Sequence, residues 1–212
     1  MDRGARLRWL LATTLSLGAC AHGSAARDHH ATNAPVGDWR LVATQADRDR
    51  IRRWRMSFVQ ALAKARPGHA GEIAAAGPLL DPDAADGGAT PPTGAYRCRM
   101  LRVGARSADM PDFLASPPFA CRIANAGGRL SLAKTEGAQR PVGFLFLDTP
   151  ERMVFLGTMM LGDEAKPLAY GRDAERDMAG TFERIGPARW RLVLPAPHWQ
   201  SLLEVLEFTP AT

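Results

Sequence analysis

The 212-residue sequence has only three cysteines, 7% aromatic residues and no hydrophobic run long enough to span a bilayer. The lack of long hydrophobic runs excludes a protein with several membrane-spanning helices. Hydrophobic residues still make up 46% of the chain and charged residues 23%, which excludes a collagen or a disordered tail. The 27 basic and 22 acidic residues give too small a net charge to indicate a nucleic-acid partner.

The signatures of a reactive centre are also scarce. The sequence has no Gly-x-Ser-x-Gly or His-Glu-x-x-His motif, and its cysteines and histidines lack the spacing of a metal site. We therefore expect no catalytic residue, no metal and no cofactor, and we favour a protein that is not an enzyme.

The N-terminus is typical of a secretory signal peptide. Three arginines precede an apolar run at residues 9–17, which ends in Leu17-Gly18-Ala19-Cys20. This tetrapeptide resembles a bacterial lipobox, so we expect residues 1–19 to be removed and Cys20 to carry lipid. The alternative is ordinary cleavage that leaves Cys20 free. Ala21 favours the outer membrane over the inner one, with the domain facing the periplasm.

Once Cys20 carries lipid, Cys98 and Cys121 remain as an even pair in an oxidising compartment, which predicts a disulfide between them. Both cysteines have arginine neighbours. The alternative is a pair of reactive thiols activated by those arginines.

Residues 20–37 are rich in small and polar residues and predict a flexible tether to a single domain at 38–212. Helix is expected from the capping box at Thr44 to a stop at Arg66-Pro67-Gly68, followed by a second helix at 69–76. An apolar stripe for packing on a core is formed by Ile51, Trp54, Phe58, Leu62 and Ala65.

The rest of this helical part, 44–76, is locally basic, with Arg48, Arg50, Arg52, Arg53, Arg55, Lys64 and Arg66. A solvated face explains these residues. The alternative is contact with anionic phospholipid or lipopolysaccharide head groups.

From Tyr96 onward, short apolar or alternating segments are separated by turn residues. We expect strands near 95–103, 119–124, 129–135, 142–147, 152–160, 167–172, 178–185, 189–194 and 202–208. Such regular spacing without helices between predicts a mainly β fold, with an antiparallel β-barrel or sandwich of about eight strands at 93–210 behind the N-terminal helical segment.

The candidate binding residues are polar side chains near the expected strand ends: Gln139, Arg140, Arg172, Asp173, Arg176, Asp177, Glu183 and Arg184. Arg140 would either bind an anionic group or cap one end of the barrel. The alternating charges from Arg172 onward would either orient a substrate or form a structural ion-pair network.

Several motifs resemble those of the bacterial domain of unknown function family 4893. The resemblance covers about residues 38–210 and is carried by Tyr96-Arg97-Cys98-Arg99, Phe119-Ala120-Cys121-Arg122, Gln139-Arg140-Pro141-Val142-Gly143, Val154-Phe155-Leu156-Gly157, Leu161-Gly162-Asp163-Glu164, Tyr170-Gly171-Arg172-Asp173, Arg176-Asp177-Met178-Ala179-Gly180 and the stretch from Glu183-Arg184-Ile185-Gly186-Pro187 to Leu194-Pro195. It implies a single domain in an exported alphaproteobacterial protein and no particular activity. Where that family has Gly-Ser-Gln-Arg, this chain has Gly137-Ala138-Gln139-Arg140, which argues against a role for a hydroxyl there.

These features predict a lipid-anchored protein of the cell envelope that binds rather than catalyses. Its partners would be the membrane surface, through the N-terminal lipid, and an unidentified envelope protein or envelope component, including an enzyme that it inhibits. A second hypothesis is a small ligand held inside the barrel. A third is an envelope hydrolase, which would need converging carboxylates from residues such as Glu164, Glu183, Glu204 or Glu207.

Overall fold

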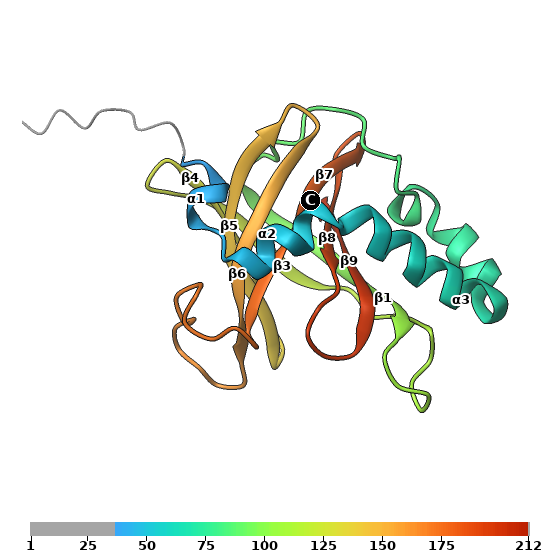
Figure 1. The fold of residues 1–212 in the computed structure, drawn as a ribbon. Coiled ribbons are helices and arrows are strands. Elements are labelled where there is room, and N and C mark those ends of the chain that lie inside the picture. Colours follow the sequence, from blue (N-terminus) through green and yellow to red (C-terminus); the bar gives the residue numbers. More distant parts are fainter. Residues whose placement is uncertain (1–36, 212) are drawn as a thin grey trace, which may run out of the picture. The chain divides into compact units, whose positions relative to one another are not determined.

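Eight antiparallel strands close into a barrel, and a helical segment lies across its outer surface (Figure 1). The computed structural model describes residues 37–211, so the signal peptide, Cys20 and all of the predicted tether except Gly37 lie outside the described residues. Within that described range, no helix is both long and apolar enough to cross a membrane.

The barrel strands are paired in the order in which they occur in the sequence. They are β1 (Gly94–Ala105), β3 (Phe119–Ala126), β4 (Arg129–Lys134), β5 (Gln139–Thr149), β6 (Arg152–Leu161), β7 (Asp177–Gly186), β8 (Arg189–Pro195) and β9 (Ser201–Pro210). The last strand, β9, pairs with β1 over almost its whole length and thereby closes the barrel. Of the two architectures expected, the barrel is therefore correct.

Two details of the strand prediction were wrong. Residues 167–172 lie in the long loop between β6 and β7, where Tyr170 contacts a helix instead of joining the sheet. A short strand, β2 (Phe113–Ala115), was not expected because three residues are too few to show alternation. It pairs with β1 at Leu101–Val103, beyond the point where the pairing of β1 with β3 ends.

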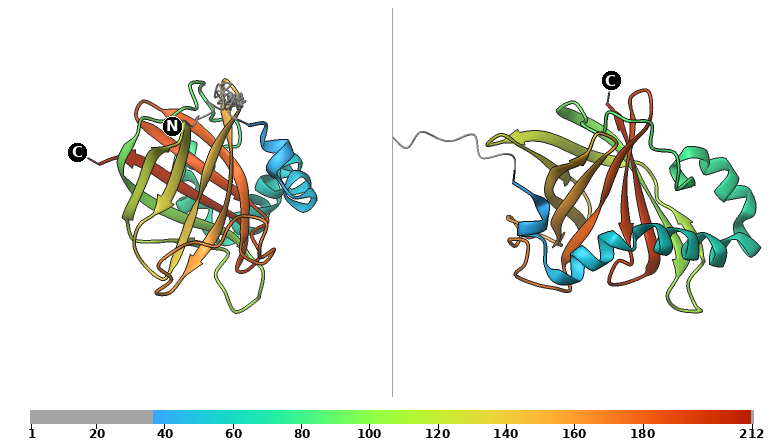
Figure 2. Two further views of the ribbon diagram at one scale, coloured as in Figure 1. Left: turned by 90° about the vertical axis from the view of Figure 1, so that its left-hand side faces the viewer. Right: turned by 45° about the horizontal axis from the view of Figure 1, so that its top comes forward.

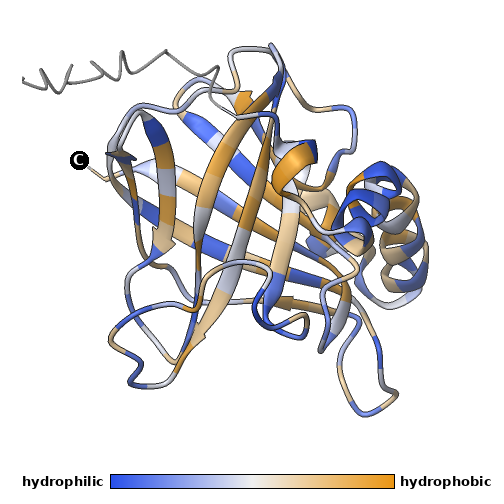
Figure 3. Ribbon diagram, turned by 60° about the vertical axis from the view of Figure 1, so that its left-hand side comes forward, coloured by the Kyte–Doolittle hydropathy of each residue, from blue (hydrophilic) through white to orange (hydrophobic). Residues whose placement is uncertain are grey.

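Hydrophobic and hydrophilic residues follow one another along the barrel strands (Figure 3). Alternation sends one set of side chains into the barrel, and these form a cluster of buried apolar residues. Phe155, Phe182, Phe208 and Leu132 are completely buried there. Gly143 and Gly157 face each other across β5 and β6, and a Cβ on either would come within 2.7 Å of the Phe155 ring. The two glycines thus make room for a phenyl ring in a filled interior.

The helical segment consists of α1 (Trp39–Val42), α2 (Gln45–Arg52), α3 (Trp54–Ala76) and the 3-10 helix η1 (Gly77–Leu80). Thr44 caps α2 as expected, because its hydroxyl accepts a hydrogen bond from the Asp47 backbone. Three details differ: α1 was not expected, the helix breaks at Arg53, and α3 continues through Pro67 to a kink at His69.

The predicted apolar stripe packs on the outside of the barrel, in two separate clusters. Phe58, Leu62 and Ala65 of α3 pack on the outer faces of β1, β8 and β9. Ile51 of α2, with Trp39 of α1, instead packs on β5, β6 and β7. The break at Arg53 separates the two clusters. The first part of α3 lies against the barrel, and its far end projects beyond the barrel edge (Figure 2).

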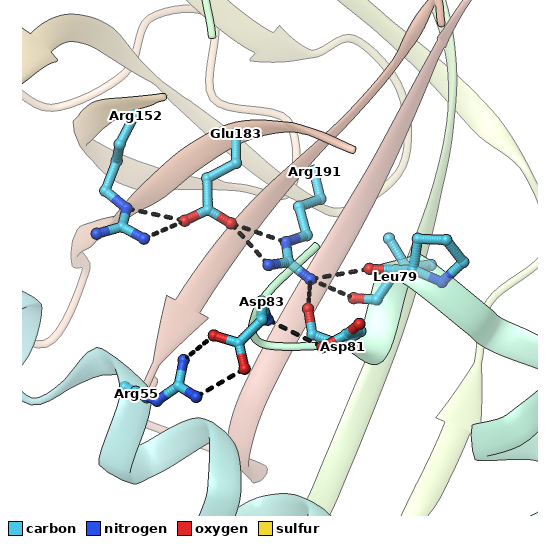
Figure 4. Close-up of polar contacts among 8 residues, drawn as sticks. Arg55, Leu79, Asp81, Asp83, Arg152, Glu183 and Arg191 are labelled. Atoms are coloured by element: carbon cyan, nitrogen blue, oxygen red, sulfur yellow. Dashed lines mark hydrogen bonds and ion pairs between the residues drawn. The ribbon is translucent and has the colours of Figure 1, made fainter. Parts of the chain in front are cut away.

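A buried ion pair lies beneath the helical segment (Figure 4). Glu183 of β7 and Arg191 of β8 are both fully buried and 2.7 Å apart. The Arg191 guanidinium also donates to the backbone carbonyls of Pro78, Leu79 and Asp81, at the C-terminal end of η1. Because the Phe58 ring is also only 5.4 Å from Arg191, the chain must turn back on itself between the start of α3 and η1.

The structure confirms the disulfide between Cys98 and Cys121. Both cysteines are buried in the barrel interior, and the bond connects β1 to β3 near the point where these strands stop pairing. It adds a covalent link to a pair of strands that share only a short ladder.

We expect the double substitution Cys98→Ala and Cys121→Ala to lower the free energy of unfolding by about 3.5 kcal/mol, because the bond closes a loop of about 24 residues in the unfolded chain. Urea unfolding of the two proteins measures the difference, and the wild type with reductant is the control. Equal unfolding midpoints for the wild type and the double variant would show that the bond does not stabilise the fold.

Candidate functional site

The two ends of the barrel are built differently. At one end, here called the loop-bearing end, the strands are joined by segments 106–118, 135–138, 162–176 and 196–200 (lower side of Figure 1). At the opposite end they are joined by the two-residue turns 127–128, 150–151 and 187–188. Long loops commonly carry binding residues, so the loop-bearing end is the first place to look for a site.

Three polar side chains lie inside the barrel near the loop-bearing end. Arg102 of β1 donates to Glu204 of β9 at 3.1 Å and to Gln139 of β5 at 3.3 Å. Their strand positions share the inward face with apolar core residues such as Met100 and Leu206. Burial raises the pKa of Glu204, although the charges of Arg102 and Lys134 act in the opposite direction.

A pocket of about 220 Å³ lies beside Arg102 and Gln139, and we call it the mouth pocket. Its polar walls come from Arg102, Ser116, Lys134 and Gln139, and its apolar walls from Met100, Leu114 and Phe119. The Lys134 ammonium lies 4.2 Å from the Phe119 ring centre and forms no ion pair with the described carboxylates. Burial and the charge of Arg102 lower the pKa of Lys134.

A second, smaller hollow lies behind Glu204. Its volume of about 20 Å³ is enough for about one water molecule. Met159, Met178 and Leu194 give it apolar walls, and His198 of segment 196–200 lies at its edge. Glu204 therefore lies between a pocket large enough for a small ligand and a hollow that can hold only solvent.

Helix α2 braces two of the loops at this end. Asp47 is almost fully buried; it accepts a hydrogen bond from the Tyr170 hydroxyl at 2.5 Å and pairs with Arg50 at 3.1 Å. Arg50 also donates to Nε2 of His198 at 2.7 Å, so this nitrogen accepts. Burial and the neighbouring Arg50 lower the pKa of His198, which favours the neutral ring.

Six of the predicted binding residues lie at the loop-bearing end: Gln139, Arg140, Arg172, Asp173, Arg176 and Asp177. Of these, only Gln139 lines the mouth pocket. Arg140 donates to the carbonyls of Gly137, Gly162 and Glu164. It thereby joins the 135–138 and 162–176 loops, an arrangement that matches the expectation that Arg140 caps one end of the barrel.

The others stabilise the 162–176 loop. Arg176 pairs with Glu164 at 2.6 Å and with Asp173 at 3.4 Å, while the carboxylate of Asp177 accepts from the Gly171 backbone. Burial raises the pKa of Asp177. Arg172 is exposed.

Glu183 and Arg184 do not join this group. Glu183 pairs with Arg152 and Arg191 beneath the helical segment, and Arg184 pairs with Asp86. The carboxylates named for the hydrolase hypothesis are each paired with arginine: Glu164 with Arg176, Glu183 with Arg152 and Arg191, Glu204 with Arg102, and Glu207 with Arg99 and Arg189. Across residues 37–211, no group of three or more histidine, cysteine or acidic residues could hold a metal ion.

Sequence reasoning missed Arg102 and Lys134. The available signal was the two-residue alternation of a strand. Arg102 lies two residues after Met100, and Lys134 two residues after Leu132, so both occupy inward positions of their strands. Residues 131–134 also form a Ser-x-x-Lys motif. On a strand, two residues three apart point to opposite faces, and the Ser131 hydroxyl donates to the Ala124 carbonyl, so the motif forms no catalytic pair here.

Most of the predicted basic face is occupied by internal contacts. Arg50 pairs with Asp47, Arg52 with Asp49, Arg55 with Asp83, and Lys64 with Asp112. The Arg48 guanidinium binds the carbonyls of Arg40 and Ala43. Four of the seven basic side chains are thereby paired with carboxylates, whereas Arg48, Arg53 and Arg66 have no carboxylate partner among the described residues.

One comparison with known proteins gives a result. The model of a family described as "Domain of unknown function (DUF4893)" matches residues 39–208, which is most of the chain. Neither a curated protein nor a solved structure matches the sequence. The match covers the helical segment and the barrel together.

The buried carboxyl of Glu204 makes stability depend on pH. Because its pKa in the folded protein lies above the usual 4.5, its contribution to stability is greatest at low pH and is lost as pH rises through the raised pKa. We expect the free energy of unfolding of the wild type to fall, relative to that of Glu204→Gln, as pH rises above about 4.5. Urea unfolding at a series of pH values tests this. A constant difference between the two proteins would contradict it.

Proposed function

Because the chain belongs to the DUF4893 family, whose function is unknown, we propose a function from the geometry of the site: a lipid-anchored protein of the cell envelope that binds an anionic ligand in its mouth pocket, without catalysis. The ligand is either a free small molecule or an exposed group of an envelope component.

The observation that carries this proposal is the charge of the mouth pocket. Arg102 and Lys134 bring two positive charges to the pocket. Glu204 pairs with Arg102, whereas the carboxylates of Glu136 and Glu204 act on Lys134 without forming an ion pair with it. Lys134 is partly desolvated, as the lowering of its pKa by burial indicates. A partly desolvated cation without an ionic partner is stabilised by an anion, so a carboxylate or phosphate beside Lys134 would be favourable.

The apolar walls indicate what the rest of the ligand is like. Leu114 lines the pocket and is 42% exposed, which is unusual for a large apolar side chain. Phe119 and Met100 line the same pocket. Pockets that bind small molecules usually combine apolar walls with a few polar groups. A ligand with an anionic head and a short apolar part fits this combination.

The filled interior argues against the alternative of a ligand held deep in the barrel. Phe155, Phe182 and Phe208 pack there with no exposed surface, so the space below Glu204 is a hydrophobic core. The proposed ligand therefore binds above the Arg102–Glu204 pair.

The predicted location supports an envelope role. The lipobox-like sequence ending at Cys20 predicts a lipid anchor, and the disulfide is of the kind that persists in oxidising compartments such as the periplasm. Ala21 favours the outer membrane. A domain on a tether of about 17 residues would sample the space close to that membrane.

Isothermal titration with octanoate and octyl phosphate tests the proposal, with octanol as the uncharged control. We expect both anions to bind and octanol not to bind, because the pocket selects a negative charge. Lys134→Gln should weaken binding of both anions about tenfold or more, as expected for the loss of one charge-assisted contact.

Lys166→Gln is the matched control, because it removes an exposed lysine from the 162–176 loop at the same end of the barrel. Equal anion affinities for Lys134→Gln and Lys166→Gln would contradict the assignment of the mouth pocket. Binding of octanol as tightly as octanoate would contradict the selection of charge.

A further inference from the structure

A separate groove runs between the helical segment and the outer faces of β5, β6 and β7. It has a volume of about 430 Å³ and lies on the outside of the barrel, away from the mouth pocket. The charged residues that line it are four arginines, Arg40, Arg48, Arg52 and Arg152, and a single carboxylate, Asp148. The proposed function does not use this groove.

Two of these arginines have carboxylate partners of their own. Arg40 pairs with Asp148 at 2.9 Å, and Arg52 pairs with Asp49. Their charges are largely neutralised, so they contribute little to a preference for anions.

Arg48 has no carboxylate partner among the described residues. Its guanidinium donates to the Gln45 side chain and to the carbonyls of Arg40 and Ala43. These contacts fix the position of the guanidinium but leave its positive charge uncompensated.

Arg152 shares its carboxylate. Its Nε and Nη2 atoms both donate to one oxygen of Glu183, while the other oxygen of Glu183 binds Arg191 (Figure 4). One buried negative charge therefore faces two guanidinium groups, and Arg191 is completely enclosed. The excess positive charge reaches solvent only through Arg152, whose side chain is 26% exposed.

The Arg152 guanidinium is also held in place. It lies 4.5 Å from the ring centre of Trp54, and its Nη1 atom has no hydrogen-bond partner among the described residues. A guanidinium that is fixed by an aromatic ring and a carboxylate, with one nitrogen free, is already oriented for an oxyanion.

A buried hydroxyl gives an independent indication of a ligand. Thr181 of β7 lines the groove and is completely buried, and its Oγ1 atom has no hydrogen-bond partner within residues 37–211. A buried polar atom without a partner costs free energy, which a bound oxygen would recover once a neighbouring side chain moves aside to expose Oγ1.

From these observations we propose that the groove binds a phosphate monoester, held by Arg48 and Arg152, with Thr181 as a neutral hydrogen-bonding group. Two excess positive charges, that of Arg48 and the one shared by Arg152 and Arg191, match a dianion better than a single carboxylate. A phosphate also offers three oxygens to accept hydrogen bonds. The phosphate belongs either to a small ester or to a lipid head group, and both present the same chemistry.

Titration calorimetry tests the proposal, with the full chain carrying Cys20→Ser so that no lipid is attached. Glycerol 3-phosphate is the free probe and glycerol is its uncharged control. Vesicles of phosphatidic acid in phosphatidylcholine are the lipid probe, with pure phosphatidylcholine as control. Binding of glycerol 3-phosphate assigns a free ester, and binding of phosphatidic acid vesicles alone assigns a head group; either result supports the site.

Arg48→Gln should weaken binding of the phosphate probe about tenfold or more, and Arg66→Gln, on an exposed part of α3 outside the groove, should leave it unchanged. Binding should also weaken as pH falls below about 6, where the monoester takes up a proton. Because loss of Arg152 disturbs Glu183, Thr181→Val serves as the second variant. Absence of binding for both phosphate probes, or equal affinities for Arg48→Gln and Arg66→Gln, would overturn the proposal.

The outcome is independent of the mouth pocket. Lys134→Gln is expected to leave affinity for glycerol 3-phosphate unchanged, because Lys134 does not line the groove. The two proposals can therefore fail separately. Arg48→Gln with glycerol 3-phosphate tests the groove, and Lys134→Gln with octanoate or octyl phosphate tests the mouth pocket.

Discussion

The buried Arg191, held by Glu183 of the barrel, connects the barrel to the helical segment. Without the helical segment, Val193 and Val205 on the outer barrel face would meet water, and Arg191 would lie among them. The end of η1 supplies three carbonyls to Arg191, while Glu183 supplies the charge. Since a buried arginine needs all of these partners, the position of the helices on the barrel is determined by polar contacts as well as by apolar packing.

The same contact accounts for the separation of the two candidate sites. Glu183 holds Arg152 at the wall of the outer groove, so the charge there follows from the way the helices dock. The mouth pocket depends instead on barrel closure, because pairing of β1 with β9 sets Arg102 beside Glu204. Asp47 and Arg50 of α2 then brace the 162–176 and 196–200 loops at this end. One site thus belongs to the helix–barrel interface and the other to the barrel itself.

Local patterns in the sequence were enough for most of the fold but not for the sites. Alternation identified the eight barrel strands, and the Thr44 cap identified α2, because both signals lie within a few residues. Closure of the barrel could not be predicted, since it pairs β1 with a strand about 100 residues away. For the same reason, no local signal showed that Glu183 would pair with Arg191 beneath η1 instead of joining the charged residues of the 162–176 loop. Nor did any local signal show that Lys134 and Arg102 would line the same pocket.

The most direct test of this account is a double-mutant cycle on the buried pair, followed by urea unfolding. Glu183→Gln should lower the free energy of unfolding by about 3–5 kcal/mol, because it leaves Arg191 buried without a carboxylate. Arg191→Met should cost less, because Glu183 keeps its ion pair with Arg152. The combined variant should cost clearly less than the sum of the two, which gives a coupling energy above about 1 kcal/mol. Additive effects of the two substitutions would contradict the claim that Glu183 and Arg191 act as one buried contact beneath the helical segment.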